Sequence, residues 1–234
     1  MISFKELVLE NLGIRLDDNQ INMFDIYYRE LIEHNKITNL TRIVDRDEVY
    51  LKHFFDSLTI SKTIELKSGQ MLCDLGTGAG FPGIPLKIVF PQIKMVLVDS
   101  LGKRITFLEK IVKILELDNV RIVKERAEEF AIKNQQKFDV VVSRAFSKLR
   151  IFLEIAIPTL KCDGKAIAMK GINYQEELTQ SFGLLRILNS KLILEDGFSL
   201  PLAMGNRTNL IFAKNRHNRG YPRKYATIIN NEVK

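Results

Sequence analysis

Short apolar runs alternate with amphipathic segments from residue 70 onward, and this alternation constrains the fold more than any other feature of the chain. The runs are the expected strands, at residues 71–75, 95–99, 120–123, 139–143, 166–170, 192–194 and 210–213. Segments with helical spacing separate the first six runs, at about 81–90, 102–117, 126–134, 147–160 and 174–189. Strands that alternate with helices in this way predict a parallel sheet covered on both faces.

The last two expected strands have no helical segment between them. Residues 195–207 contain Gly and Pro and are expected to form a loop, so the two strands would pair as a hairpin and add an antiparallel strand at the edge. Five parallel strands followed by such a hairpin are typical of a seven-stranded methyltransferase sheet. The expected fold class is therefore α/β, a Rossmann-like class I methyltransferase with a mostly parallel sheet.

The first 66 residues show mostly helical spacing, which breaks at residues 35–41, where a loop is expected. One apolar stripe ends at Gly13, and a second follows a capping-box pattern that starts at Asp17 and places Gln20 at the third helical position. A third helix is expected over about 45–61. We therefore expect an N-terminal helical extension at residues 1–66 and a methyltransferase domain with a basic C-terminal tail at residues 67–234.

The glycine loop after the first expected strand, 74-DLGTGAGFPG-83, fits two cofactor patterns. Gly78, Gly80 and Gly83 form G-x-G-x-x-G, which is typical of dinucleotide sites. Asp74, Gly76, Gly78 and Gly80 form D-x-G-x-G-x-G, which is typical of S-adenosylmethionine sites. The strand is expected to end at residue 75, so the turn begins at Gly76, where the dinucleotide spacing is not met. This position favours S-adenosylmethionine over NAD.

Two acids at strand ends bear on the same choice. A carboxylate at Asp74 suits the ammonium group of a methionine moiety and would repel a pyrophosphate. Asp99, at the end of the second strand, can bind both hydroxyls of a ribose, which both cofactors contain. Alternatively, Asp74 is a turn or N-cap residue and Asp99 caps the helix that follows it.

The residues expected near this loop favour a methyl acceptor that needs no general base. Residues 138–149 lack the Asn/Asp-Pro-Pro-aromatic motif of exocyclic-amine methyltransferases, and neither Cys73 nor Cys162 is placed as a nucleophile. The three histidines are dispersed and do not predict a metal site. A ring nitrogen such as guanine N7 has a free lone pair at neutral pH, so its methylation requires only in-line positioning.

The net charge of +7 is unevenly distributed. Residues 214–234 contain six basic residues and one acidic residue, which favours a polyanionic partner such as RNA. The alternative is a solvated lysine-rich surface.

Two cysteines do not make a disulfide framework, the N-terminus has no secretory signal, and no apolar run approaches a membrane span of about 20 residues. A cytoplasmic protein is expected.

Several longer motifs resemble those of one family. They are 39-NLT-41, 53-HFFDS-57, 74-DLGTGAGFPGIPL-86, 98-VDSLGKR-104, 127-AEEF-130, 143-SRA-145, 169-MKG-171 and 221-YPRK-224. With these motifs the chain resembles the glucose-inhibited division protein B family, the bacterial 16S ribosomal RNA guanine-N7 methyltransferases. The resemblance covers nearly the whole chain. The tail departs from it, because 225-YATIINNEVK-234 stands where many relatives have a Pro-Gly-Thr-Pro-type run.

The resemblance implies a function that the residues alone do not specify. The chain would transfer a methyl group from S-adenosylmethionine to N7 of one guanine in 16S rRNA, near the decoding centre. The alternative is a methyltransferase for another RNA or for a small molecule. The implied partner is 16S rRNA or the small ribosomal subunit, with no metal and no membrane, and the chain is expected to act as a monomer.

The resemblance also implies where the donor binds. Its contacts would be Gly76, Phe81, Ala127, Glu128 and Arg144, with Asp99 on the ribose and Ala127 and Glu128 beside the adenine; Asp74 and Gly78 complete the expected cofactor site. Alternatively, Glu128 is a solvated acid in the first turn of a helix and Phe81 is a core residue.

Arg144 and Lys170 are the expected catalytic residues, because they end the fourth and fifth strands at the edge where ligands gather. An arginine forked onto guanine O6 and N7 would cover the attacking lone pair. We therefore expect Arg144 or Lys170 to hold O6, a phosphate or the donor's carboxylate and to leave N7 free. Alternatively, Arg144 pairs with Asp74 or Glu128.

Three further residues are expected to contact the substrate: Asn39, His53 and Arg223. Asn39, His53 and Asp56 would meet near the cofactor cleft, although His53 and Asp56 could instead pair with each other on one helix. Arg223 belongs to a set of basic residues that would contact phosphates. The set is Lys103, Arg104, Lys148, Arg150, Arg219, Arg223 and Lys224.

Overall fold

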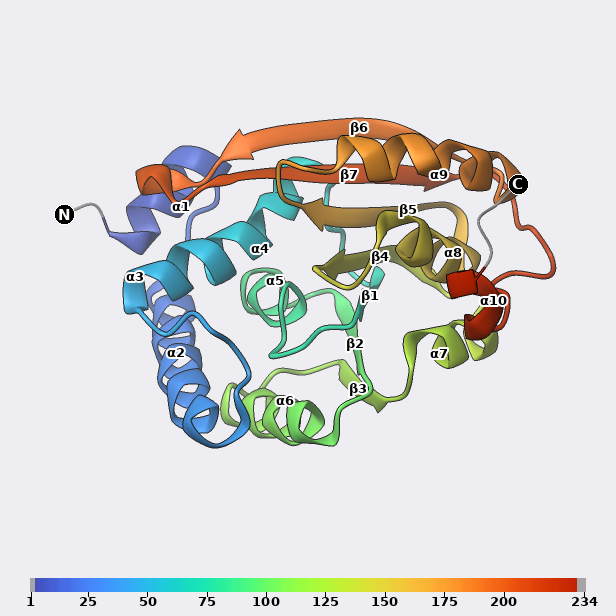
Figure 1. Cartoon of the computed structure of the whole chain (residues 1–234). Helices are drawn as coiled ribbons and strands as arrows, with labels where there is room; N and C mark the ends of the chain where they lie inside the picture. Colours follow the sequence, from blue (N-terminus) through green and yellow to red (C-terminus); the bar gives the residue numbers. More distant parts are fainter. Residues whose placement is uncertain (1–2, 231–234) are drawn as a thin grey trace.

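A seven-stranded sheet runs through the middle of the molecule (Figure 1). The computed structural model describes residues 3–230. The strands are β1 (Met71–Leu75), β2 (Lys94–Asp99), β3 (Val120–Lys124), β4 (Phe138–Arg144), β5 (Leu160–Lys170), β6 (Ser190–Ser199) and β7 (Asn206–Lys214). Their order is β3-β2-β1-β4-β5-β7-β6, and only the pairings of β7 are antiparallel. The expected mostly parallel α/β sheet is confirmed.

The hairpin at the end of the sheet is longer than its apolar pattern predicts. β7 lies between β5 and β6, so the antiparallel strand is not the outermost one. Residues 195–199, expected to be a loop, continue β6 and pair with the first residues of β7 from Leu210 back to Asn206. This expectation was wrong because 195-EDGFS-199 lies largely outside the core, and its strand structure depends on ladder hydrogen bonds rather than on an apolar face.

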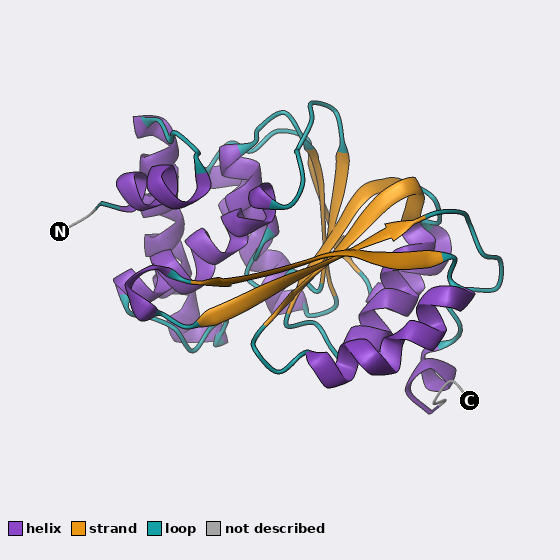
Figure 2. Cartoon of the chain, turned by 90° about the horizontal axis from the view of Figure 1, so that it is seen from above, coloured by secondary structure: helices purple, strands orange, loops and turns teal. Residues whose placement is uncertain are grey.

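The helices lie in two layers, one on each face of the sheet (Figure 2). One layer contains α5 (Gly83–Val89) and α6 (Gly102–Ile114), together with the N-terminal helices. The other contains α7 (Ala127–Lys133), α8 (Leu149–Thr159) and α9 (Gln175–Ile187). Successive residues of β1 alternate between the two cores: Leu72 faces the first layer, and Cys73 faces the second. Both faces are therefore buried, as a parallel sheet requires.

The N-terminal helices pack on the sheet and share its first core. α1 (Phe4–Leu12) and α2 (Asp18–Thr38) are followed by a rod made of α3 (Arg46–Val49), a π-helix (Tyr50–Phe55), α4 (Asp56–Leu58) and a 3-10 turn (Thr59–Lys62). The expected capping box of Asp17 and Gln20 is confirmed. Tyr27 of α2 stacks on Phe81 of the glycine loop at 5.4 Å between ring centroids. A division between residues 66 and 67 stays a prediction.

The C-terminal segment returns along the second layer. Here α10 (Tyr225–Asn230) packs against α8, and Arg150 donates from α8 to the carbonyl of Ile228. Residues 231–234 of the expected basic tail lie outside the described residues. Within residues 3–230, no helix combines the length and apolar character that a membrane crossing needs.

The topology brings several strand ends together. β1, β2, β4 and β5 are parallel, so their carboxyl ends lie at one edge of the sheet, and the reversal of strand order occurs between β1 and β4. In open α/β sheets, ligands bind at such a switch point. In Figure 1 the rod of α3 and α4 lies beside this edge.

Candidate functional site

The glycine turn after β1 uses the register that begins at Asp74. Gly76 and Gly78 have φ of 69° and 62°, values that glycine adopts without strain. A Cβ at Gly76 would also lie 2.4 Å from Phe146 Cδ2, so a side chain there would collide with the aromatic ring. Gly83 begins α5, as expected for a residue outside the turn. The spacing G-x-G-x-x-G therefore arises from overlap between a turn and a helix start.

Asp74 ties this turn to α5. Its carboxylate is fully buried, and Oδ2 accepts hydrogen bonds from Thr77 Oγ1 at 2.7 Å and from Gly83 N at 2.8 Å. Burial raises the pKa of Asp74 to about 7, against the effect of these two hydrogen bonds. The structure thus gives Asp74 the turn-and-cap role that was the alternative expectation, and its contact with a cofactor stays a prediction.

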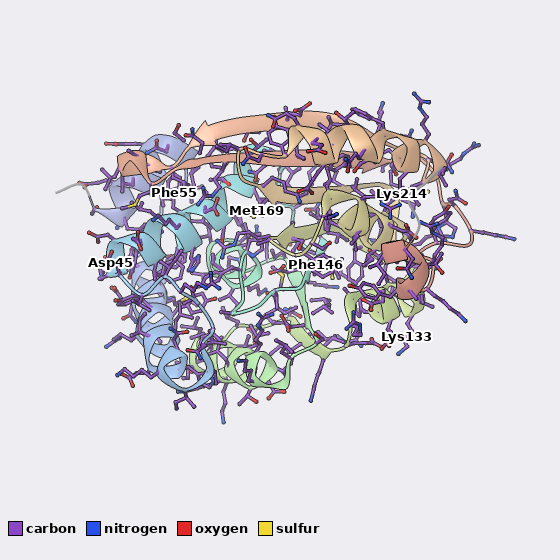
Figure 3. All side chains as sticks on the ribbon, viewed as in Figure 1. Asp45, Phe55, Lys133, Phe146, Met169 and Lys214 are labelled. Carbon is purple, nitrogen blue, oxygen red and sulfur yellow. The ribbon has the colours of Figure 1, made fainter. Side chains whose placement is uncertain are left out.

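A pocket of about 290 Å³ opens beside the turn. Its lining comes from the ends of β1, β2 and β4 and from the start of α7, and consists of Gly76, Val98, Asp99, Ser100, Arg104, Glu125, Ala127, Ala145 and Phe146. Of the expected cofactor residues, the pocket therefore contains Gly76, Asp99 and Ala127. Figure 3 labels Phe146 in the loop after β4, in the middle of the view.

Asp99 has room for a ligand hydroxyl. Its Oδ1 accepts from Leu101 N at 2.9 Å, and Oδ2 accepts from Gly78 N at 3.0 Å and Arg104 Nη1 at 3.1 Å. Leu101 is the N-cap of α6, which has no side-chain cap, so Asp99 holds the turn before the helix and the alternative expectation that it caps the helix was wrong. An ionised carboxylate has about four acceptor positions. One position remains, and the partly exposed Arg104 could release a second. This fits a ribose with two neighbouring hydroxyls.

Ala127 and Glu128 have different surroundings. Ala127 begins α7 and lines the pocket. Glu128 is buried and forms an ion pair with Arg126, so the alternative of a solvated acid is wrong. Its contact with an adenine stays a prediction. Glu125, which the sequence did not single out, lines the pocket and binds Lys133.

Arg144, at the end of β4, binds the N-terminal rod. Nη1 donates to the carbonyl of Lys52 at 2.9 Å and to Asp56 Oδ2 at 3.3 Å, and Nη2 donates to His53 Nδ1 at 3.0 Å. The alternative partners Asp74 and Glu128 were therefore wrong. The expectation missed Asp56 because the two residues are 88 positions apart and meet only when the rod packs beside the sheet edge.

Phe81 lies under this cluster as a core residue. Arg144 Cζ lies 4.9 Å from its ring centroid, and the rings of His53 and Tyr27 stack on it at 4.5 and 5.4 Å. The side chain is buried, which agrees with the alternative expectation of core packing. Its contact with a cofactor stays a prediction.

His53 is held neutral in one tautomer. Nδ1 lies 3.0 Å from Arg144 Nη2, which can only donate, and 3.1 Å from the Lys52 carbonyl, which can only accept and already accepts from Arg144 Nη1. We therefore assign Nδ1 as the acceptor from Arg144 and the proton to Nε2, which lies 3.0 Å from Thr41 Oγ1 and donates to it in this tautomer. Burial and the charge of Arg144 lower the pKa of His53 to about 3. The structure joins His53 and Asp56 through Arg144, so His53 serves as a fixed acceptor for the guanidinium.

Asp56 is shared between two arginines. Arg207 Nε lies 3.6 Å from the same Oδ2 that binds Arg144, whereas Oδ1 is buried without a hydrogen-bond partner among the described residues. Burial raises the pKa of Asp56, and the two guanidinium groups oppose that rise. Sequence reasoning missed Arg207, because only the antiparallel pairing of β7 with β5 brings the start of β7 to this edge.

Lys170, at the end of β5, holds the loop after β4. Nζ donates to Glu177 Oε2 at 2.8 Å and to the carbonyl of Ser147 at 3.2 Å. The same Glu177 oxygen accepts from Leu149 N at the start of α8. Arg144 and Lys170 thus fix the two sides of the segment between β4 and α8, and their catalytic roles stay predictions.

The remaining expected substrate residues lie apart from each other. Asn39 ends α2 with φ of 48°, is exposed, and precedes by two residues the Thr41 that binds His53. Arg223 binds the fully buried Glu154 of α8 through Nε and Nη2, both at 2.7 Å. The structure therefore gives Arg223 a fixed partner within the protein, and the substrate contacts of Asn39, His53 and Arg223 stay predictions.

The relatives of this chain share one description. A sequence model of the family "rRNA small subunit methyltransferase G" matches residues 20–191. The curated protein of that name from Acholeplasma laidlawii is 48% identical over 217 residues, which cover 93% of this chain and 94% of that protein. The protein from Pediococcus pentosaceus is 43% identical, with 94% and 93% covered.

Solved structures share the fold at low identity. TYW2 from M. jannaschii, solved in complex with AdoMet, superposes with a TM-score of 0.54 at 16% identity over 70% of this chain and 77% of that chain. TrmN from Thermus thermophilus superposes with a TM-score of 0.55 at 12% identity, covering 70% and 53%. These superpositions show a shared Rossmann-like fold. The family match and the identity to curated relatives along nearly the whole length establish that the chain belongs to the rRNA small subunit methyltransferase G family.

Proposed function

We propose that this chain transfers a methyl group from S-adenosylmethionine to N7 of one guanine in 16S rRNA of the small ribosomal subunit. The observation that carries this proposal is the pocket formed by Gly76, Asp99 and Ala127 at the switch point of the sheet, in a member of this family. An acceptor in another RNA, or a small molecule, is the alternative.

The residues around the pocket fit the donor. Gly76 leaves the space that a Cβ would fill, Asp99 keeps acceptor capacity for the ribose, and Ala127 with Glu128 would border the adenine. Asp74 holds the glycine turn against the start of α5 by accepting a hydrogen bond from Gly83 N. When bound, the donor supplies a methyl group on a sulfonium ion, which becomes a neutral thioether once guanine N7 has taken the methyl group.

The ionisable groups near the pocket favour an acceptor that loses no proton. His53 stays neutral and binds Arg144 and Thr41, and the pocket acids Asp99 and Glu125 are paired with Arg104 and Lys133. Guanine N7 already presents a lone pair, so the chain has only to hold the base in line with the methyl group. We assign this positioning of the base to residues at the carboxyl ends of β4 and β5.

Arg144 is the residue we assign to the orientation of the guanine or the donor. A guanidinium has five N–H donors, and the three contacts to Lys52, Asp56 and His53 leave two N–H groups, one on Nε and one on Nη2, to bind a further acceptor. That acceptor would be O6, a phosphate or the donor's carboxylate, so that N7 stays free. Lys170 would support it by fixing the loop after β4.

The RNA would approach the same edge of the sheet. Asn39, His53 and Arg223 remain candidates for substrate contacts, together with the basic surface residues. We place the protein in the cytoplasm because its proposed substrate is ribosomal, and we treat it as a monomer. We also keep the division into a helical extension at residues 1–66, which supplies His53 and Asp56, and a catalytic domain at residues 67–234.

The test is the modification state of 16S rRNA in a strain that lacks this chain. N7-methylguanosine is cleaved by reduction followed by aniline, so wild-type RNA gives a cleavage band that the deletion strain should lose and that the purified chain plus S-adenosylmethionine should restore. A band that persists in the deletion strain would exclude this substrate. Calorimetry of the purified chain should show binding of S-adenosylhomocysteine and no heat with NAD.

A further inference from the structure

The loop between β4 and α8 carries one aromatic side chain into the pocket. Phe146 is half-buried, lines the pocket, and approaches Gly76 so closely that a Cβ there would lie 2.4 Å from its Cδ2. It is the single aromatic residue in the lining of that pocket within the described chain. Phe146 also packs, partly buried, against the core of the second layer, so its ring borders both that core and the pocket.

The loop is held rigidly on both sides of Phe146. On one side Arg144 binds the rod through Lys52 and His53, and on the other Lys170 binds the carbonyl of Ser147. Ala145, between these anchors, has φ of 52°, which turns the chain sharply. Two independent ion networks therefore set the position of one ring.

The ring lines the pocket from the β4 side of the switch point. Gly76, Asp99 and Ala127, the proposed donor contacts in that pocket, lie at or just after the ends of β1, β2 and β3, whereas Phe146 follows β4 and packs against Gly76. Phe81, the other aromatic residue near the cluster, is covered by Arg144, His53 and Tyr27, so a base cannot stack on it. Phe146 is the ring that remains available.

The chemistry of N7 favours recognition by a ring face. The lone pair of N7 lies in the plane of the guanine, so contacts to the base edge compete with the methyl group for the same space. Stacking uses the face of the base and leaves every edge free. A base presented to an enzyme must also leave its own stack, and an aromatic side chain replaces that lost contact.

We infer that Phe146 is the stacking platform for the methyl-accepting guanine, a substrate-binding residue that holds the base face while Arg144 and the donor approach its edges. The inference rests on the proposed function.

The first experiment compares Phe146→Ala, Phe146→Leu and Phe146→Tyr with the wild type on small-subunit rRNA from cells lacking the chain. We expect kcat/KM to fall about 5- to 150-fold in the Ala and Leu variants, the range for loss of one base–aromatic stack, and to stay within about threefold in the Tyr variant. Affinity for S-adenosylhomocysteine, measured by calorimetry, should change less than about threefold in all three.

Two outcomes would overturn the inference. Wild-type kcat/KM in Phe146→Leu would mean that an apolar side chain suffices, and a donor affinity that falls as much as kcat/KM would mean that the ring holds the donor. If the wild type itself produced no N7-methylguanosine, the proposed function would fail instead, so the two failures are distinguishable.

A second experiment reports stacking without turnover. The chain contains no tryptophan, so Phe146→Trp introduces a single indole at the proposed platform. Its fluorescence should be quenched by 16S rRNA in the presence of S-adenosylhomocysteine, and much less by an equal mass of large-subunit rRNA. Phe182→Trp, at an exposed position of α9, is the matched control and should show equal, weak quenching with both RNAs. Equal quenching of the two indoles by 16S rRNA would contradict the inference.

Discussion

Two buried arginine–carboxylate pairs in this molecule have the same charges but different geometry. Arg223 and Glu154 form a fork with two hydrogen bonds of 2.7 Å, and Arg223 N also donates to Glu154 Oε1. Arg144 and Asp56 share one bond of 3.3 Å, and the other carboxylate oxygen of Asp56 is unpartnered among the described residues. Burial is similar in both, so the difference lies in how fully the donors and acceptors are satisfied.

We interpret the difference as one between a structural pair and a candidate functional pair. The fork at Glu154 fastens the C-terminal segment to α8 and satisfies both oxygens of the buried carboxylate. The donors of Arg144 are spread over a carbonyl, an imidazole and a carboxylate next to the candidate pocket. Local rules are commonly violated at functional sites, and the unsatisfied pair is the one at the carboxyl edge of the sheet.

The largest expected effect is on stability at the fork. Arg223→Ala would leave the Glu154 carboxylate buried without a cation, and the free energy of unfolding should fall by about 3–5 kcal/mol. Denaturant titration measures this change. The exposed Arg219 is the control, because Arg219→Ala should change stability by less than about 0.5 kcal/mol. Equal stability of Arg223→Ala and Arg219→Ala would show that the Arg223–Glu154 fork does not stabilise the fold.

The next effect is on activity at the edge of the sheet. Arg144→Lys keeps the charge beside Asp56 but cannot reach the carbonyl, the imidazole and the carboxylate together. We expect kcat/KM on small-subunit rRNA to fall about 100-fold, the usual effect of misplacing a positioning group, with a smaller loss of stability than in Arg223→Ala. The matched variant Arg223→Lys should reduce kcat/KM much less than Arg144→Lys does, because Arg223 lies away from the pocket and binds Glu154. The opposite pattern, with activity lost only at Arg223, would reverse the comparison.

The third expected effect is a pH dependence of stability that arises at the cluster of Arg144, His53 and Asp56. The pKa of His53 falls from 6.5 to about 3 on folding, so its contribution to stability is present above pH 6.5 and is lost as the pH falls toward 3. Between pH 7 and pH 5 the free energy of unfolding of the wild type should fall by about 2 kcal/mol more than that of His53→Asn. In this variant the amide oxygen accepts from Arg144 and does not titrate. The measurement is the free energy of unfolding against pH, and parallel curves would show that His53 titrates normally.

The smallest expected effect is a loss of stability at Thr41, which binds His53 at the outer end of the cluster. Thr41→Val removes the oxygen that accepts from His53 Nε2 and from Ile43 N, and should cost about 1 kcal/mol of stability. Thr38→Val removes a hydroxyl that only donates back to the carbonyl of His34 within α2, and should be nearly neutral. Equal costs would show that the hydroxyl of Thr41 does not hold the histidine in place.

The strands, the helix start and the turn register were predictable because each depends on residues that are close along the chain. The alternating apolar pattern places all seven strands, the capping box of Asp17 and Gln20 begins α2 as expected, and the turn register starting at Asp74 follows from the end of β1. The strand at residues 195–199 was missed, since its ladder bonds depend on a partner and not on its own apolar spacing.

The sequence by itself determined the sheet, the glycine turn and the family, because each of these rests on residues that are close along the chain. Only the tertiary structure decided which groups meet at the edge. Asp56 comes from the N-terminal rod, Arg144 from β4 and Arg207 from β7, and their separations of 88 and 151 positions carry no periodic signal. Their meeting follows from the packing of the rod beside the sheet and from the reversal of β7, which bury one carboxylate between two guanidinium groups.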